Sequence, residues 1–239
     1  MPQEVKKLKD HVQNQIEHDV GQVFNFITGT LNQKPVVFGA ANVGTAFAAS
    51  AATIMALKFQ VTAIIFTGVA GGLLENQKIG DIIVGKDVVN YDMDCRSFTY
   101  DFDPDYKLKL GELPFLNWIQ FTADSALLAL AKSAPVPEGR TLHVGRIATG
   151  SIFIDAEKKI SMRETHWKHL DYPAACDMEN AAVAQICRAF GVPYISLRAL
   201  SDLITGDATG DFNKFCQEVA DALFPVVSHV VGGYASEQV

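Results

Sequence analysis

The sequence predicts an α/β fold in which a central β-sheet carries helices on both faces. One observation is that strand-like and helix-like segments alternate along the chain, as they do in sheets of this class. A second is the continuously apolar run at 63–68, which is typical of a strand buried on both faces. A third is size, because 239 residues, 49% apolar and 20% charged, suit one large globular domain over residues 1–239.

Residues 36–90 contribute three predicted strands and one helix. A β-rich run at 36–40 predicts the first strand. The alanine-rich segment from Thr45 to Leu57 predicts a helix whose small side chains allow close packing on a sheet. The apolar run at 63–68 predicts the next strand, which leads into a glycine-rich turn at 67–72. Residues 82–90 predict the third strand.

The second half contributes two further strands and three helices. Residues 124–133 predict an amphipathic helix with Asp124 as its N-cap and an apolar face of Ala126, Leu127 and Leu130. The remaining predicted elements are strands at 142–149 and 194–202, a helix at 179–190 that ends at Gly191 before Pro193, and a last helix at 212–231.

Polar or glycine-rich segments follow three of the predicted strands, at 67–72, 149–154 and 201–202. Ligands of open α/β sheets bind beyond the carboxyl ends of the strands. We therefore expect these three segments to meet at one ligand site. Residues 92–116 are loop-like and rich in aromatic side chains, and such a long loop is often a lid or an interface element.

Composition excludes several classes of protein. A net charge of −7 gives no electrostatic support to nucleic-acid binding. No run of about 18 apolar residues predicts a membrane span, and the charged N-terminus lacks the apolar core of a signal peptide. We therefore expect a cytoplasmic protein with neither a membrane nor a nucleic-acid partner.

The cysteines and histidines predict no metal site. The cysteines fit no zinc motif and are expected to be reduced thiols; they are Cys95, Cys176, Cys187 and Cys216. His166 and His169 have a spacing that could hold a metal ion, but with no evident carboxylate partner a solvated surface pair is favoured. We expect no metal and no cofactor.

Three short motifs carry groups suited to chemistry, although each has a structural interpretation on its own. The sequence TGVAGG at 67–72 is neither a Walker loop nor a G-x-G-x-x-G motif, and it suits a tight turn. Asp177 and Glu179 open a helix and could simply cap it. Asp202 follows a buried strand, where aspartate often caps a turn.

In combination, these motifs resemble the bacterial methylthioadenosine/S-adenosylhomocysteine nucleosidase family of the nucleoside phosphorylase superfamily. The resemblance rests on the order and spacing of TGVAGGL, TGSIFI, DMEN and RALSD, with MPQEV, GDIIV and GELP at matching places. It covers residue 1 to about residue 231. It implies a nucleoside phosphorylase-like fold, a single three-layer domain with a mixed central β-sheet flanked by helices.

The resemblance also implies a role for each matching residue. Asp202 would be the catalytic acid that protonates N7 of the purine, oriented by Ser201, and Glu4 would activate the attacking water. Glu179 would hydrogen-bond the ribose hydroxyls. The other implied binding residues are Met178 on the sugar, Phe153 and the Ile154 backbone at adenine, and Val43, Phe98, Pro114 and Phe212 around the 5′ substituent.

The chemistry explains why these residue types are needed. An N-ribosidic bond breaks through an oxocarbenium-like transition state, and adenine leaves poorly as an anion. General acid help, worth about 10²–10⁴ in rate, is therefore needed at N7. A carboxylic acid that does this near pH 7 needs a raised pKa or a proton delivered late. Carboxylates such as Glu179 and Glu4 would stabilise the ribose cation.

Two features depart from the family's pattern. Val69 stands where many relatives have a serine, so a hydroxyl contact near the water site would be lost. The family also begins with an apolar strand just before its Met-x-x-Glu-Val segment, whereas this sequence starts at Met1, which leaves Glu4 near a terminus. We expect a helix over 6–16 to bring Glu4 to the site by docking an apolar stripe of Val5, Leu8, Val12 and Ile16.

The resemblance also implies a homodimer, in which Cys95, Phe98 and Pro114 reach the 5′ pocket of the partner subunit. The composition of the 92–118 segment independently favours an interface, because it gathers many apolar side chains in one loop. A two-fold dimer is the simplest closed assembly.

The predicted function is hydrolysis of adenine nucleosides with an apolar 5′ substituent, such as 5′-methylthioadenosine or S-adenosylhomocysteine. A phosphorylase is the nearest alternative, but Phe66 stands where related phosphorylases have an arginine, and Val69 offers no hydroxyl to a phosphate. A non-catalytic nucleoside-binding protein is disfavoured because Asp202, Glu179 and Glu4 occur together. The preferred 5′-substituted adenosine stays open, aminodeoxyfutalosine and 5′-deoxyadenosine included.

Overall fold

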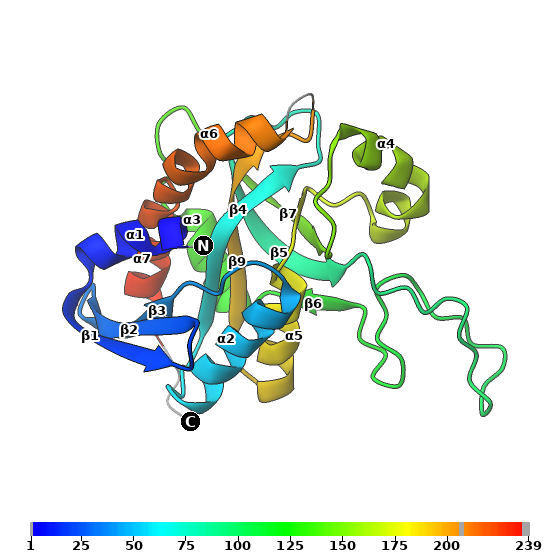
Figure 1. The fold of residues 1–239 in the computed structure, drawn as a ribbon, viewed down its shortest axis with the longest axis horizontal. Coiled ribbons are helices and arrows are strands. Elements are labelled where there is room, and N and C mark those ends of the chain that lie inside the picture. The colour runs from blue at the N-terminus through cyan, green and yellow to red at the C-terminus, as the bar shows by residue number, and fades with distance from the viewer. Residues whose placement is uncertain (1, 206–207, 236–239) are drawn as a thin grey trace.

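Six strands form the central sheet of the computed structural model, which describes residues 2–205 and 208–235 (Figure 1). The strands are β4 (Ile64–Gly72), β5 (Ile82–Asn90), β6 (Gln120–Thr122), β7 (Leu142–Thr149), β8 (Ala175–Asp177) and β9 (Tyr194–Asp202). Their order is β6-β5-β7-β8-β4-β9, with parallel β5–β7, β7–β8 and β4–β9 pairs and antiparallel β5–β6 and β4–β8 pairs. The first half of β5 also pairs with β9, so this mixed sheet closes on itself.

Three antiparallel strands form a second, smaller sheet in the order β1-β2-β3. They are β1 (Gln13–Val20), β2 (Phe24–Leu31) and β3 (Lys34–Gly39). Only β3 was predicted from the sequence. β1 is polar and almost wholly exposed, so it lacks the apolar run that marks a buried strand.

Helices cover both faces of the central sheet and so give the predicted three-layer α/β fold. They are α1 (Pro2–His11), α2 (Thr45–Leu57), α3 (Ser125–Ser133), α4 (Ala156–Thr165), the short 3₁₀ helix η1 (Trp167–Leu170), α5 (Asn180–Phe190), α6 (Ala208–Asp221) and α7 (Phe224–Gly233). On one face α2 and α5 lie side by side (Figure 1). On the other face lie α3, α6 and α7, packed on alternate residues of the same strands.

Most predicted elements are confirmed. The observed bounds of α2, β5, β7 and β9 are the predicted ones. The Asp124 carboxylate accepts hydrogen bonds from the Ala126 and Leu127 backbone N–H groups, each at 3.0 Å, and so caps α3 as predicted. Ala126 itself is exposed, and the buried face of α3 is formed by Leu127 and Ala131. Helix α5 ends at Gly191, whose φ of +68° is left-handed, a conformation that glycine adopts without strain.

Three predictions were wrong in detail. The glycine-rich segment 67–72 is not a turn but the second half of β4. The predicted helix 212–231 is two helices, because Pro225 has no N–H to continue the first one and instead lies at the start of α7. The predicted helix over 6–16 ends at His11, and Ile16 lies exposed on β1.

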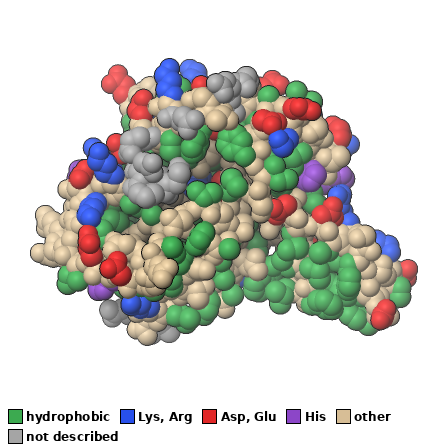
Figure 2. All heavy atoms as spheres, viewed as in Figure 1, with side chains coloured by type: hydrophobic (Ala, Val, Ile, Leu, Met, Phe, Trp, Pro, Cys, Tyr) green, Lys and Arg blue, Asp and Glu red, His purple; other side chains and the backbone are tan. Residues whose placement is uncertain are grey.

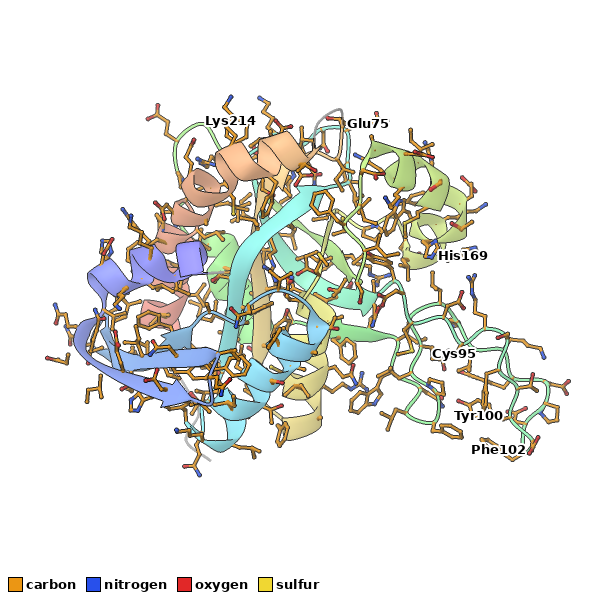
Figure 3. All side chains as sticks on the ribbon, viewed as in Figure 1. Glu75, Cys95, Tyr100, Phe102, His169 and Lys214 are labelled. Carbon is orange, nitrogen blue, oxygen red and sulfur yellow. The ribbon has the colours of Figure 1, made fainter. Side chains whose placement is uncertain are left out.

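Residues 92–118, here called the arm, project from the body of the molecule (Figure 1). Apart from two isolated bridges, the arm contains no regular strand or helix. Figure 3 places Cys95, Tyr100 and Phe102 along it. Several of its large apolar side chains are exposed, including Phe102 at 78% and Phe115 at 70%, and they form the hydrophobic patch at the lower right of Figure 2.

We find no helix within residues 2–205 and 208–235 that has the length and apolarity needed to cross a membrane.

Candidate active site

A cavity of about 820 Å³ runs along β4, and its polar end lies at the carboxyl end of that strand. The lining there includes Gly71, Phe153 and Asp202, one from each of the three segments that the sequence singled out. The three segments therefore do meet at one place. The volume lies within the range of about 300–1,000 Å³ that is usual for small-molecule sites.

Asp202 is the last residue of β9 and is 4% exposed. Its Oδ1 accepts a hydrogen bond from the Ile204 backbone N–H at 3.1 Å, and its Oδ2 accepts one from the Ser201 hydroxyl at 3.0 Å. Burial raises the pKa of the Asp202 carboxyl above its usual value, although these hydrogen bonds oppose the shift. The side chain is therefore suited to hold a proton and to give it up to a bound base.

Gly71 and Gly72 bring the end of β4 close to Asp202. They pair with Cys176 and Ala175 of β8, and neither glycine has a positive φ. A Cβ on Gly71 would lie 2.8 Å from the Ile204 side chain and 3.2 Å from Asp202 Oδ1. The glycines are therefore needed for close approach rather than for a turn.

The two carboxylates of the DMEN motif have different surroundings. Asp177 is buried, where it accepts hydrogen bonds from the Thr149 hydroxyl at 2.6 Å and the Asn180 N–H at 3.1 Å, and it pairs with Arg198 at 2.8 Å. Glu179 is half-buried, lines the cavity and accepts a hydrogen bond from the Gly44 N–H at 2.9 Å. Asp177 lines the cavity as well, but its oxygens are engaged by these buried partners, so Glu179 is the one that we expect to meet a ligand, with Met178 beside it in the lining.

The segment predicted to bind the base is held by Tyr91. The Tyr91 hydroxyl donates to the Ile152 carbonyl at 2.9 Å, and the ring lies so close to Gly150 that a Cβ there would clash. Phe153 is 45% exposed at the cavity, whereas the Ile154 side chain is buried. Phe153 therefore presents its ring to the cavity while Ile154 anchors the segment in the core.

The remaining predicted residues divide into two groups. Val43, Val69 and Phe212 line the cavity. Phe98 and Pro114, and with them Cys95, lie on the arm and are not part of the lining formed by their own chain.

Glu4 cannot be placed at the site, because its side chain lies outside the described residues. Its backbone is in α1, and the neighbouring Val5 lines the cavity. Val5 and Leu8 pack against a cluster that contains Val12, Ile27 and Phe38. Three of the four residues in the predicted docking stripe therefore contact the core.

Sequence reasoning missed two cavity residues that act through tertiary contacts. Arg198 was not among the predicted site residues, yet it lines the cavity, where its guanidinium lies 4.5 Å from the centre of the Phe66 ring. An arginine within an apolar strand indicates, from the sequence alone, that it has a buried partner, because arginine is almost never buried without one. Phe66 was noted only because it stands where related phosphorylases have an arginine.

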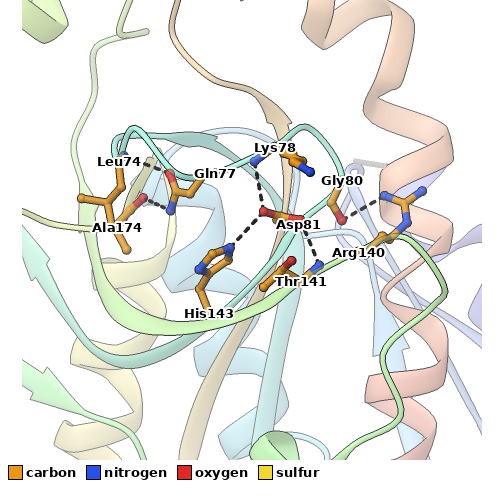
Figure 4. A network of polar contacts seen from close by, with 9 residues as sticks. All are labelled: Leu74, Gln77, Lys78, Gly80, Asp81, Arg140, Thr141, His143 and Ala174. Atoms are coloured by element: carbon orange, nitrogen blue, oxygen red, sulfur yellow. Dashed lines mark hydrogen bonds and ion pairs between the residues drawn. The ribbon is translucent and has the colours of Figure 1, made fainter.

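A second polar network holds the connection between β4 and β5 (Figure 4). Asp81 accepts hydrogen bonds from His143 and from the N–H groups of Lys78 and Thr141, at 2.9–3.0 Å. Gln77 donates to the Ala174 carbonyl at 2.8 Å. These contacts fix the segment that follows the glycines of β4, so they support the site without facing it. Within the described residues, no three histidine, cysteine or acidic side chains gather to hold a metal ion.

The comparison with known families gives one match. Residues 1–232 match the family described as the Phosphorylase superfamily. A 5′-methylthioadenosine/S-adenosylhomocysteine nucleosidase from Staphylococcus haemolyticus is 33% identical over 231 residues, which are 97% of this chain and 96% of that protein.

Solved structures agree with the sequence match. A 5′-methylthioadenosine/S-adenosylhomocysteine nucleosidase from Colwellia psychrerythraea, in complex with adenine, has a TM-score of 0.88 at 28% identity and covers 98% of this chain and 92% of that one. The futalosine hydrolase of Helicobacter pylori has a TM-score of 0.84 at 28% identity, with 98% and 95% covered.

Proposed function

The chain belongs to the Phosphorylase superfamily and, within it, to the 5′-methylthioadenosine/S-adenosylhomocysteine nucleosidase family, and on that premise we propose that it hydrolyses adenine nucleosides and releases adenine. The bond cleaved is the N-ribosidic bond. The observation that carries the proposal is the buried Asp202, whose pKa is raised by burial, at the polar end of a cavity that Glu179 and Phe153 also line.

We assign the proton transfer to Asp202. With a purine stacked on Phe153, the acid donates its proton toward N7, and the base leaves as a neutral molecule. Ser201 stabilises the carboxylate that remains, because its hydroxyl already donates to Oδ2. Burial favours the protonated acid before the reaction, and the Ser201 hydroxyl stabilises the carboxylate after it. Each protonation state of Asp202 is therefore stabilised by its surroundings.

We assign the sugar to Glu179 and Met178, and the activation of water to Glu4. A carboxylate at the cavity wall accepts hydrogen bonds from ribose hydroxyls and stabilises the positive charge that develops on the ring. The position of Val5 in the cavity lining supports an approach of Glu4 from α1. Val69 leaves that part of the wall without a hydroxyl.

We further propose that the working form is a homodimer in which the arm supplies Phe98, Pro114 and Cys95 to the partner's 5′ pocket. The exposed apolar surface of the arm supports this arrangement, because a patch of that kind is best covered by another subunit. Light scattering at micromolar concentration tests it, and a monomer would contradict it.

We place the enzyme in the cytoplasm, in methionine salvage. The four cysteines are thiols, and three of them are buried, which suits a reducing compartment. Apolar residues dominate the cavity beyond the polar end, and this favours a thioether substituent on the ribose over a phosphate.

A substrate panel, assayed with and without phosphate, tests the function. Free adenine is measured with methylthioadenosine, S-adenosylhomocysteine, 5′-deoxyadenosine and aminodeoxyfutalosine. We expect adenine and a free ribose sugar, at a rate that phosphate does not change. Cleavage that requires phosphate and yields a sugar 1-phosphate would identify a phosphorylase instead. Binding of the nucleosides without any cleavage would identify a nucleoside-binding protein.

A further inference from the structure

Lys159 on α4 reaches the loop that follows Asp202. Its Nζ donates hydrogen bonds to the Leu203 carbonyl at 3.0 Å and to the Gly72 carbonyl at 3.2 Å. Leu203 is the residue after Asp202, and Gly72 is the last residue of β4. One ammonium group therefore joins the carboxyl ends of two neighbouring strands beside the proposed acid.

The backbone of Lys159 is itself tied to the segment proposed to bind the base. Helix α4 begins directly after Ile154, and its N-cap Asp155 accepts a hydrogen bond from the Lys158 N–H at 2.9 Å. The Trp167 indole donates to the Lys159 carbonyl at 3.0 Å. A movement of the base-binding segment would therefore be transmitted through α4 to the loop after Asp202.

That loop needs external support, because Ile204 has a φ of +53°. A left-handed conformation is strained for a β-branched residue and persists only where the surroundings impose it. The Ile204 N–H is also the group that binds Asp202 Oδ1. If the loop relaxed, the acid would lose one of its two hydrogen bonds.

We propose that Lys159 is a positioning residue of the nucleosidase reaction, which fixes Asp202 relative to the base-binding segment through the Leu203 and Gly72 carbonyls. This inference rests on the proposed function, since it assumes that Asp202 is the acid. Lys159 acts in this role without touching the substrate.

Charge gives the inference a second, independent consequence. Among the described side chains, the charged and titratable groups that face Asp202 are Lys159 from α4, Asp211 from α6 and Cys176 from β8. Lys159 lowers the pKa of Asp202, whereas burial, the largest effect, and Asp211 raise it. The acid must be protonated to act, so activity is lost as pH rises through its pKa. This loss of activity is the basic limb of the pH profile. Removing the lysine charge should therefore move the basic limb to higher pH.

Three substitutions separate the charge from the hydrogen bonds. Lys159→Met removes both, Lys159→Gln keeps an N–H donor without the charge, and Lys159→Arg keeps both. Lys158→Met is the matched control, because Lys158 lies on the same helix and forms only a partly exposed ion pair with Asp155. Each protein is assayed for kcat, KM and the pH dependence of adenine release, and thermal unfolding checks that it is folded.

We expect kcat to fall about tenfold to a hundredfold in Lys159→Met, because small misplacements of a catalytic group cost that much. In Lys159→Met and Lys159→Gln the basic limb should move upward by on the order of half a pH unit. Lys159→Arg should keep the limb of the unmodified protein, and Lys158→Met should behave like that protein throughout.

An unchanged kcat in Lys159→Met overturns the inference. A fall in kcat with an unmoved basic limb in both uncharged variants also overturns it, because a purely structural role would give that result. If Lys159→Met does not fold, the inference is tested by the position of the basic limb in Lys159→Gln and Lys159→Arg alone. If the unmodified protein releases no adenine, it is the proposed function that has failed, and the two failures are thereby distinguished.

Discussion

Asp202 combines two properties that suit a general acid, since burial raises its pKa and so favours the protonated form, and the side chain lies on the cavity wall. Asp202→Asn keeps the shape of the side chain and its bond from the Ile204 N–H, but asparagine cannot donate an acidic proton. We expect the rate of adenine release to fall by at least about 10². Asp171→Asn, which changes an exposed carboxylate paired with Arg146, is a suitable control. Near-normal turnover of Asp202→Asn would refute the assignment.

The same substitution should have the opposite effect on stability. The folded protein raises the pKa of Asp202 above its usual value of 3.8, so it binds the proton more tightly than the unfolded chain does. Stability is therefore lost as pH rises from about that usual value through the raised one. Asparagine does not ionise, so the Tm of Asp202→Asn relative to the unmodified protein should increase between pH 4 and pH 8. A relative Tm that falls over this interval would contradict the sign of the pKa shift.

The order and spacing of the motifs were enough to predict the site residues that the motifs contain. They could not predict the residues that act through tertiary contacts. Asp202 and Glu179 were singled out, and both line the cavity. Lys159 and Tyr91 were not, because nothing near them in the sequence reveals that their partners are Leu203 and Ile152. Polar side chains that hold other residues have no motif of their own.

At the scale of elements, the glycines of β4 set the distance between three strand ends. Gly71→Ala would push its Cβ against the Ile204 side chain, which is 2% exposed and has little room to move. We expect a loss of stability of about 1–3 kcal/mol, typical of overpacking, and about a tenfold fall in kcat because the Ile204 N–H binds Asp202. Chemical denaturation and adenine release measure the two effects.

The double variant Gly71→Ala/Ile204→Ala tests whether a side chain at position 71 meets the Ile204 side chain. Ile204→Ala alone leaves a space in the core, and the methyl group that Gly71→Ala introduces would partly fill it. The double variant should therefore lose less stability than the sum of the two single variants. Additive losses would show that the two side chains do not meet.

Strands could be predicted from the sequence where a run of apolar residues marks them. Strands β5, β7 and β9 were found because their apolar runs are buried in the central sheet. Strands β6 and β8 have three residues each, too few for any periodicity to register. Strand β4 was cut short at its glycines, because glycine in a sequence signals a turn as readily as a close approach.

For the whole molecule, the main departure from expectation is the division of the strands into two sheets. Among the described strands β3 pairs only with β2, and residues 64–67 of β4 pair only with β9. Residues of both strands line the apolar part of the cavity, which includes Val36, Phe38 and Ile64. The cavity therefore continues from the polar site into a space between the two sheets. The sequence alone could not show this space, because it depends on how the two sheets lie relative to each other.

An added strand should fill that space. Six apolar residues placed ahead of Met1 would extend about 20 Å, the length of the six residues of β3, and could pair with β3 on one side and β4 on the other. Helix α1, which carries Glu4, would then be anchored at its start as well as through Val5 and Leu8. We expect a higher Tm and a faster turnover, with little change in KM, because only the placement of Glu4, the residue proposed to activate water, improves. The matched control carries an added segment of equal length with alternate prolines, which cannot donate to a sheet. Equal Tm and equal turnover in the two fusions would show that no strand enters between β3 and β4, and an unchanged rate in Glu4→Gln would show that anchoring α1 has no bearing on the chemistry.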